Sequence, residues 1–208
     1  LSLTQTLIDS VVTFTSTIRN WGTKECLNLV RPKLTNAMWG AGLSFHRCHA
    51  EIMVPVDPYL DQVFDGEEGS RGIRFFSHGY DVYTPDRVLV THDYKKHQSN
   101  PVVHSWGGRL LRGKQEEQRD VWSFTQAIES ARSDLTTFGT TRVNVLLGIG
   151  PNIEEEHAQE LESIRYGRFG LGTKRSLAQA VEFSGIDLRR QEMVENRCGW
   201  AAAGKAAL

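Results

Sequence analysis

The hydrophobic pattern changes near residue 115, and this change constrains the fold more than any other feature of the sequence. Before it, short extended segments alternate with glycine-containing turns, as in the run Trp39–Phe45. After it, apolar residues recur at alternating spacings of three and four, the period of an amphipathic helix. They are Val121, Phe124, Ile128, Ala131, Leu135 and Phe138. We therefore predict an α/β region over residues 1–114 and a helical region over residues 115–208.

Two more helices are expected in the second region. Ile153–Ile164 is acidic and periodic, and Ser176–Ser184 follows it. Thr173 is a candidate N-cap for the later helix and Gly185 a candidate stop, because these residue types satisfy or end a helix terminus. Apolar stripes of this kind usually face a core, so we expect all three helices to be packed along their apolar faces.

Charge and hydropathy exclude several classes of partner. The chain has 24 basic and 25 acidic residues, a formal net charge of −1, spread without long runs. Nucleic acids and anionic membrane surfaces require a clustered basic face, so neither is expected as the main partner. No apolar stretch approaches the roughly 20 residues of a membrane-spanning helix.

The cysteines bear on the compartment. Cys26, Cys48 and Cys198 are too few for a disulfide scaffold, which favours an intracellular reducing compartment or an organelle. The alternative is a secretory protein with one disulfide and one free thiol. Because the sequence begins at Leu1 without an initiator Met, we expect a processed or truncated piece.

The densest polar cluster is Asp65-Gly66-Glu67-Glu68. Two carboxylates after a glycine suit the N-terminus of a helix, where the helix dipole favours negative charge. The second interpretation is chemical, since a carboxylate can bind a sugar hydroxyl or assist proton transfer at an acceptor. Both interpretations remain open for Glu67 and Glu68.

Two further residues suggest a divalent ion. Asp9 and His92 each close a strand-like segment, Thr6–Asp9 and Arg87–Tyr94 respectively. Ligands of open α/β sheets bind beyond the ends of strands, and such a pair suits manganese. The alternative is an aspartate that caps a turn and a hydrogen-bonded core histidine.

Zinc is a weaker hypothesis. His46, Cys48 and His49 lie close together, with Cys26 upstream, but their spacing matches no zinc motif.

Several ordered motifs together resemble a known family, that of N-acetylglucosaminyltransferases which modify hydroxyproline on a ubiquitin-ligase adaptor or Thr on parasite mucins. The resemblance covers residues 39 to about 190. Gly170–Thr173, Arg175, Phe183 and Gly185–Asp187 look like the family's C-terminal element. The matching runs are Trp39-Gly-Ala-Gly-Leu-Ser-Phe45, Val54-Pro-Val-Asp-Pro58, Val63-Phe-Asp-Gly-Glu-Glu68, His78-Gly-Tyr-Asp-Val-Tyr83 and Val90-Thr-His92.

The resemblance implies a glycosyltransferase A-type fold with a mixed sheet. It also implies a UDP-sugar, UDP-GlcNAc, a divalent metal such as Mn²⁺, and transfer with retention of configuration. It assigns Glu67 and Glu68 to catalysis. It assigns Trp39, Tyr80 and Asp81 to substrate binding, and Asp9 and His92 to the metal.

Two departures from the family pattern change the expected function. The family's Asp-x-His metal motif corresponds to Asp9-Ser10-Val11, so a valine without donor atoms stands where a second ligand is expected. Only eight residues precede Asp9, whereas an A-type fold builds its nucleotide pocket before this motif. We therefore expect the C-terminal part of an A-type mixed sheet, without the nucleotide-binding half, followed by helices.

Three hypotheses about the function follow. The first is a catalytically inactive, glycosyltransferase-like accessory or structural subunit of a larger assembly, which needs no cofactor. The second is a fragment of an active enzyme that uses Mn²⁺ and UDP-GlcNAc on hydroxyproline or Thr of a protein acceptor. The third is a module that binds sugars or peptides in an aromatic cleft near Trp39, Tyr80 and Tyr83.

A truncated A-type sheet would expose strand edges and apolar surface, which invite association. We therefore predict that a protein partner or the missing N-terminal half covers residues 1–40. The alternative is that the helices after residue 115 cover this surface. The expected contacts are Leu7, Ile8, Val12, Phe14 and Trp21.

Overall fold

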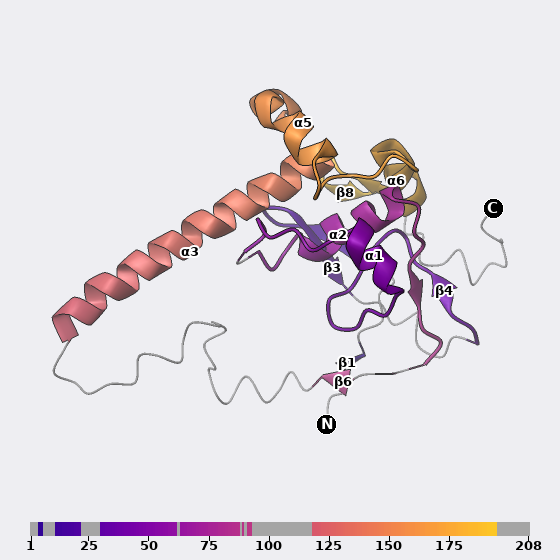
Figure 1. The fold of residues 1–208 in the computed structure, drawn as a ribbon, viewed down its shortest axis with the longest axis horizontal. Coiled ribbons are helices and arrows are strands. Elements are labelled where there is room, and N and C mark those ends of the chain that lie inside the picture. Colours follow the sequence, from indigo (N-terminus) through magenta and orange to yellow (C-terminus); the bar gives the residue numbers. More distant parts are fainter. Residues whose placement is uncertain are drawn as a thin grey trace.

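The computed structural model describes residues 4–5, 11–21, 30–61, 63–87, 89, 91–92 and 118–194 (Figure 1). Within these ranges the chain combines six helices with eight short strands, so the predicted α/β class is confirmed. These strands pair two by two in four antiparallel sheets, and no larger mixed sheet is present in the described part. Most of them are two residues long, which leaves too few backbone groups for a wide ladder.

The strand pairs join distant parts of the chain as well as neighbours. β2 and β3 form a hairpin in which Val12 lies opposite Asn20, and it places Ile18 in the core. The pairs are β1 (Thr4–Gln5) with β6 (Thr91–His92), β2 (Val11–Phe14) with β3 (Ile18–Trp21), β4 (Lys33–Leu34) with β5 (Tyr83–Thr84), and β7 (Ile186–Asp187) with β8 (Glu192–Met193).

The three helices predicted after residue 115 are all present. The acidic one is interrupted at His157, so it appears as α4 and α5. Two helices precede them. The second, α2, begins at Glu67, as the interpretation of the acidic cluster as a helix N-terminus predicts. The helices are α1 (Cys48–Met53), α2 (Glu67–Ser77), α3 (Gln118–Leu147), α4 (Ile153–Glu156), α5 (Ala158–Tyr166) and α6 (Leu177–Ser184).

The ends of α6 show one correct and one wrong prediction. Gly185 ends the helix in a left-handed conformation with φ 70°, as predicted. The N-cap is Ser176 and not Thr173, because Ser176 lies next to the first turn. Its hydroxyl accepts from the backbone N–H of Gln179, whose side chain accepts from the Ser176 N–H in return.

One hydrophobic core draws on both predicted regions. Its fully or nearly fully buried residues come from the β2–β3 hairpin, the loop before α1, α2, the end of α3, α6 and the β7–β8 pair. They are Ile18, Ala37, Met38, Ile73, Phe76, Val143, Leu146, Leu147, Ile149, Ala180, Ile186 and Leu188. The packing therefore joins residues on the two sides of position 115 into one body.

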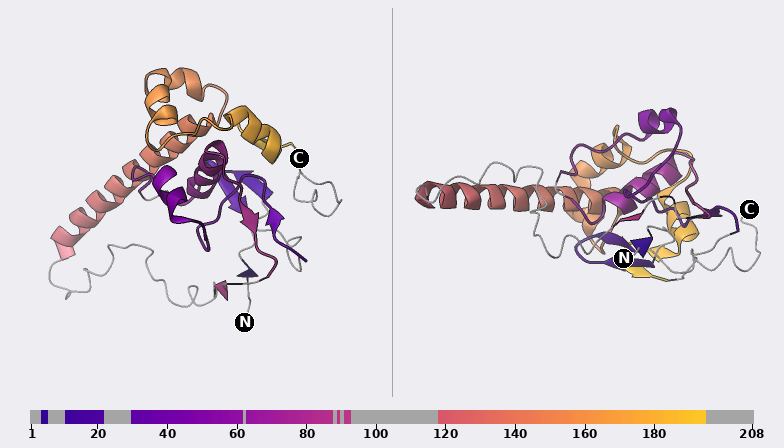
Figure 2. Two further views of the ribbon diagram at one scale, coloured as in Figure 1. Left: turned by 45° about the vertical axis from the view of Figure 1, so that its right-hand side comes forward. Right: turned by 90° about the horizontal axis from the view of Figure 1, so that it is seen from below.

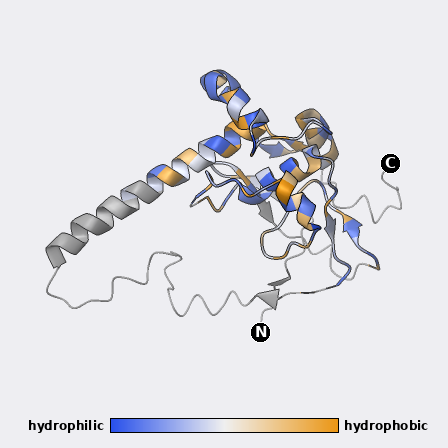
Figure 3. Cartoon of the chain, viewed as in Figure 1, coloured by the Kyte–Doolittle hydropathy of each residue, from blue (hydrophilic) through white to orange (hydrophobic). Residues whose placement is uncertain are grey.

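Helix α3 projects from this body (Figures 1 and 2). Its last turns carry Val143 and Leu147 into the core, whereas Leu135 and Phe138 are 44% and 55% exposed. Figure 3 shows hydrophobic residues on the projecting part. The prediction that the whole stripe is core is therefore wrong at these two positions, because among the described residues the other elements reach only the C-terminal end of the helix. The side chains of Val121, Phe124, Ile128 and Ala131 lie outside the described set.

Part of the segment 1–40 is covered by the chain itself. Phe14 packs against the main core, and Met38 is fully buried within it. Phe14 is only partly buried, so contact with a partner stays a prediction there. Leu7 and Ile8 lie outside the described residues, as do the side chains of Val12 and Trp21, so there the partner remains a prediction. Within the described residues, no helix combines the length and apolar character needed to cross a lipid bilayer.

Candidate functional site

A cavity of about 240 Å³ lies between the loop before α1 and the segment that follows α2. Aromatic rings make up much of its wall, and a few polar groups interrupt them. The aromatic lining residues are Trp39, Phe45, Phe75, Tyr80 and Tyr83, and the polar ones include Ser44, His46 and Asp81. All three predicted substrate-binding residues, Trp39, Tyr80 and Asp81, therefore line the same cavity. We call it the aromatic cavity.

The first wall of the aromatic cavity is the loop from Trp39 to His46. Its position follows from close packing of its backbone against the backbone of α2. A Cβ on Gly72 of α2 would lie 2.5 Å from the carbonyl oxygen of Ala37 and 2.8 Å from the Trp39 nitrogen, so glycine is required for this approach. The Trp39 indole then donates to the Ser44 hydroxyl at 2.8 Å. This bond ties the indole to the loop that carries Phe45.

The second wall of the aromatic cavity is the segment Tyr80–Tyr83, which Arg175 holds in place. The Tyr80 ring packs edge-on against Phe75, with 5.8 Å between ring centroids. Arg175 donates to the Asp81 carboxylate at 2.7 Å and to the Tyr80 carbonyl, and its guanidinium lies over the Phe76 ring. Asp81 thus reaches the cavity with one oxygen already bound, and its position depends on Arg175.

Glu68 lies behind the first wall. Its carboxylate accepts from the Ala41 N–H at 2.8 Å, directly after Gly40, which lines the aromatic cavity. Burial raises the pKa of Glu68, the Ala41 hydrogen bond opposes this rise, and the charges of Glu67 and Asp65 add to it. A carboxyl group with a raised pKa is better suited to donate a proton near neutral pH than an exposed glutamate.

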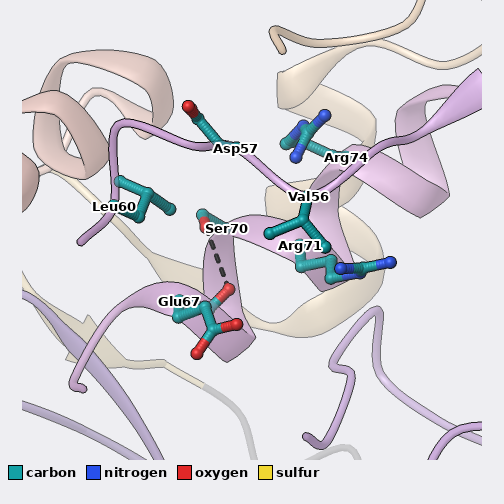
Figure 4. A pocket seen from close by; sticks show the side chains of 7 residues that line it. All are labelled: Val56, Asp57, Leu60, Glu67, Ser70, Arg71 and Arg74. Carbon is teal, nitrogen blue, oxygen red and sulfur yellow. Dashed lines mark hydrogen bonds between the residues drawn. The ribbon is translucent and has the colours of Figure 1, made fainter. Parts of the chain in front are cut away.

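Glu67 points elsewhere. It lines a smaller cavity of about 120 Å³, whose lining also includes Asp57, Ser70, Arg71 and Arg74. Figure 4 shows Glu67 across this cavity from Asp57 and Arg74. The two glutamates predicted to be catalytic are therefore neighbours on α2, but their side chains lie in different surroundings.

Asp57, Arg71 and Arg74, three of the charged residues around the smaller cavity, have partners outside its lining. Asp57 accepts from Arg142 at 2.7 Å. Arg74 donates to the carbonyls of Pro55 and Gly170. Burial lowers the pKa of Arg74 to about 10, with Asp57 opposing the shift, so it stays charged at neutral pH. These contacts suit packing of α2 better than ligand binding.

The predicted metal site stays a prediction, because the described residues do not include both of its ligands. Asp9 lies outside the described residues, and only the backbone of His92 is described, in β6 opposite Thr4. Figure 1 shows the β1–β6 pair away from the start of α2, which carries Glu67 and Glu68. Among the described residues, no cluster of three or more His, Cys, Asp or Glu side chains is arranged to hold a metal ion.

The weaker zinc hypothesis gains no support. His46 contacts Glu51 through Nε2 at 2.8 Å, Cys48 is an exposed free thiol, and Cys26 lies outside the described residues.

Several residues that shape the aromatic cavity were missed in the sequence. Arg71 and Glu51 form an ion pair against its first wall, and Arg175 anchors its second. Charged residues on a helix are usually solvated, so the pattern gives no reason to bury Arg71. One signal was present, because Arg71 and Phe75 are four residues apart and therefore adjacent on one helix face.

Comparison with known proteins adds the family. Residues 3–190 match the family described as Glycosyltransferase (GlcNAc). No curated protein and no solved structure matches the chain. The match runs through the hairpin, both walls of the aromatic cavity and the C-terminal anchor at Arg175. Because it spans most of the sequence, the chain belongs to the GlcNAc glycosyltransferase family.

Proposed function

We propose that this chain binds an N-acetylglucosamine-containing ligand in the aromatic cavity and serves as an accessory subunit of a larger assembly, without transferring the sugar itself. The observation that supports the binding most directly is the cavity. Trp39, Tyr80 and Asp81, which come from two separate motifs of the family pattern, line one space.

The lining suits a sugar chemically. Aromatic rings offer flat apolar surfaces to the C–H faces of a pyranose ring and of an acetyl group. The Ser44 hydroxyl and the second oxygen of Asp81 supply hydrogen-bonding groups in the lining. The volume of about 240 Å³ suits a monosaccharide unit better than a whole nucleotide sugar.

The accessory role is inferred from the residues that this chain offers as ligands for a metal ion. The family pattern asks for an Asp-x-His pair and a distant His, and this chain supplies Asp9, Val11 and His92. Valine has no atom that coordinates a cation, so the residues present do not fit a three-ligand manganese site. No catalytic step of this chain is therefore assigned to a metal ion.

The binding proposal is tested by titration with UDP-GlcNAc and with free N-acetylglucosamine, followed by calorimetry. We expect both to bind the wild type and Trp39→Ala to lose the binding. Phe64→Ala is the matched control, because Phe64 is 85% exposed and lines neither cavity. Equal affinity in the wild type and Trp39→Ala would show that the aromatic cavity is not the site.

The accessory role is tested with Mn²⁺. We expect weak or no Mn²⁺ binding and no hydrolysis of UDP-GlcNAc. Val11→His should strengthen Mn²⁺ binding, and Asp9→Ala should then abolish it. Tight Mn²⁺ binding by the wild type that disappears in Asp9→Ala would contradict the accessory role.

An active enzyme is the second candidate, and Glu68 is the observation that favours it. A half-buried carboxyl group with a raised pKa, close to the aromatic cavity, suits proton transfer at an acceptor hydroxyl. The acceptor would be hydroxyproline or Thr of a protein, with Mn²⁺ and UDP-GlcNAc supplied to the assembled complex. Transfer to a peptide that is lost in Glu68→Gln would favour the enzyme over the accessory subunit.

A further inference from the structure

Arg71 is a buried cation in the middle of α2. Only 5% of the residue is exposed. Its guanidinium carbon lies 4.7 Å from the centroid of the Trp39 ring and 5.4 Å from that of Phe75. One of its nitrogens also donates to the carboxylate of Glu51 in α1. The positive charge is therefore held between two aromatic faces and one carboxylate.

These contacts lead to the aromatic cavity. Trp39 and Phe75 line it, and so does His46, whose Nε2 lies 2.8 Å from the same Glu51 oxygen that Arg71 binds. Arg71 is not part of the lining. It lies behind the wall and contacts two wall residues directly and a third through Glu51.

Stability alone does not account for Arg71. Its Nε is buried and has no hydrogen-bond partner among the described residues. Removing a donor from water without a partner is unfavourable, and burying a cation adds to that cost. Arg74, one turn later on the same helix, instead donates to the Pro55 and Gly170 carbonyls, which lie outside the cavity lining. The two buried arginines therefore have different surroundings.

We propose that Arg71 is a positioning residue, which holds Trp39, Phe75 and His46 in the arrangement that receives the sugar-containing ligand. The inference rests on the proposed function of the aromatic cavity. The cation fixes the tilt of the indole through its ring face, while the Ser44 hydroxyl fixes the opposite, polar edge through Nε1. With both ends held, the ring presents a preorganised surface to the ligand, and less ordering remains to be done on binding.

The first experiment compares three variants of the full chain by calorimetric titration with UDP-GlcNAc. Arg71→Met keeps the length and apolar stem but removes the charge, and we expect about a tenfold loss of affinity, the scale on which residues that do not touch the ligand act. Arg71→Lys keeps the charge without the planar fork and should retain part of the affinity. Arg74→Met is the matched control and should lower the unfolding midpoint while leaving the affinity of the folded protein unchanged.

The second experiment does not depend on a ligand. The chain has five tryptophans, and 5-fluorotryptophan labelling gives each a ¹⁹F resonance, of which that of Trp39 is assigned with Trp39→Phe. We expect the Trp39 resonance to shift in Arg71→Met and to stay in place in Arg74→Met. Should Arg71→Met fail to fold, Glu51→Gln replaces it, because it weakens the hold on Arg71 and keeps the shape of the side chain.

The outcomes separate the two proposals. If the wild type binds neither UDP-GlcNAc nor N-acetylglucosamine, the proposed function fails, and the ¹⁹F shift still decides whether Arg71 positions the wall. If the wild type binds and Arg71→Met binds equally well, the positioning role is overturned and the proposed function stands. An unmoved Trp39 resonance in Arg71→Met overturns the role in either case.

Discussion

Helices α2 and α3 contrast in pattern and in burial. α2 has eleven residues, many of them Glu, Gly, Ser or Arg, yet every residue from Gly69 to Ser77 is buried. α3 has thirty residues and a regular apolar repeat, yet it exposes Leu135 and Phe138. The difference follows from position. α2 contacts β3, α3 and α6, whereas only the C-terminal part of α3 reaches the common core. Burial is decided by what surrounds a helix, and amphipathic spacing only shows which face could be buried.

The largest expected effect compares one apolar residue from each helix. Ile73→Ala in α2 removes a side chain that is 1% exposed, and we expect a loss of about 4 kcal/mol in the free energy of unfolding. Leu135→Ala in α3 should cost less than about 1 kcal/mol, because the residue is already 44% exposed. Urea denaturation of both variants measures this. Equal losses would mean that a partner or another segment covers Leu135.

The next prediction concerns the part of α3 that is packed. Arg142 near its C-terminal end pairs with Asp57, whose side chain is 2% exposed. Arg142→Met leaves a buried carboxylate without its counter-ion, so we expect a loss of about 3 kcal/mol in the free energy of unfolding. In Arg142→Met/Asp57→Asn, much of this loss should return. A loss below about 1 kcal/mol for the single variant would show that the end of α3 is as loosely held as its exposed part.

A third pair of variants raises helix propensity in both helices. Gly72→Ala in α2 places a methyl group against the backbone of Ala37 and Trp39, and we expect a net loss of about 2 kcal/mol in spite of the better helix former. Thr137→Ala in α3 removes an exposed hydroxyl that bonds the Ser133 carbonyl, and we expect a gain of about 0.5 kcal/mol. Thermal denaturation of both variants measures whether each change lowers or raises the stability. Stabilisation by Gly72→Ala would refute the close approach of the Trp39 loop.

The smallest effect depends on pH and concerns the first turn of α2. Because burial raises the pKa of Glu68 in the folded protein, the folded state holds this proton more tightly than the unfolded state. The unfolding free energy should therefore fall as pH rises from the ordinary pKa of a glutamate through the folded one. Glu68→Gln keeps an acceptor for the Ala41 N–H and should flatten this decline. An unchanged pH profile would place Glu68 in a more exposed environment than the structure gives it.

Local patterns predicted the local features. The 3–4 spacing indicated α3, the acidic cluster after Gly66 indicated the start of α2, and Gly185 indicated the end of α6. Each of these depends on residues within a few positions of one another. The candidate substrate residues came instead from the resemblance to a family, and the structure brings Trp39, Tyr80 and Asp81 to one cavity.

The remaining features depend on contacts between distant residues. Nothing near Arg71 in the sequence indicates that Trp39 and Glu51 will surround it, and burial of a charged residue is rare without such partners. The sequence does not indicate the exposure of Leu135 either, because a stripe of apolar residues has the same spacing whether or not another element covers it.

The bond between Arg175 and Asp81 also has a consequence for biosynthesis. The two residues are 94 positions apart, so at about 5 to 20 residues per second a ribosome needs about 5 to 20 s to add the second after the first. During that interval the nascent chain already carries Phe76 and Tyr80 but not the guanidinium that packs on one and holds the other. These rings are thus available to chaperones until Arg175 emerges. If the aromatic cavity binds a sugar as proposed, a ribosome-bound chain that stops before Arg175 should bind none, because the group that holds Asp81 and Tyr80 has not yet been added.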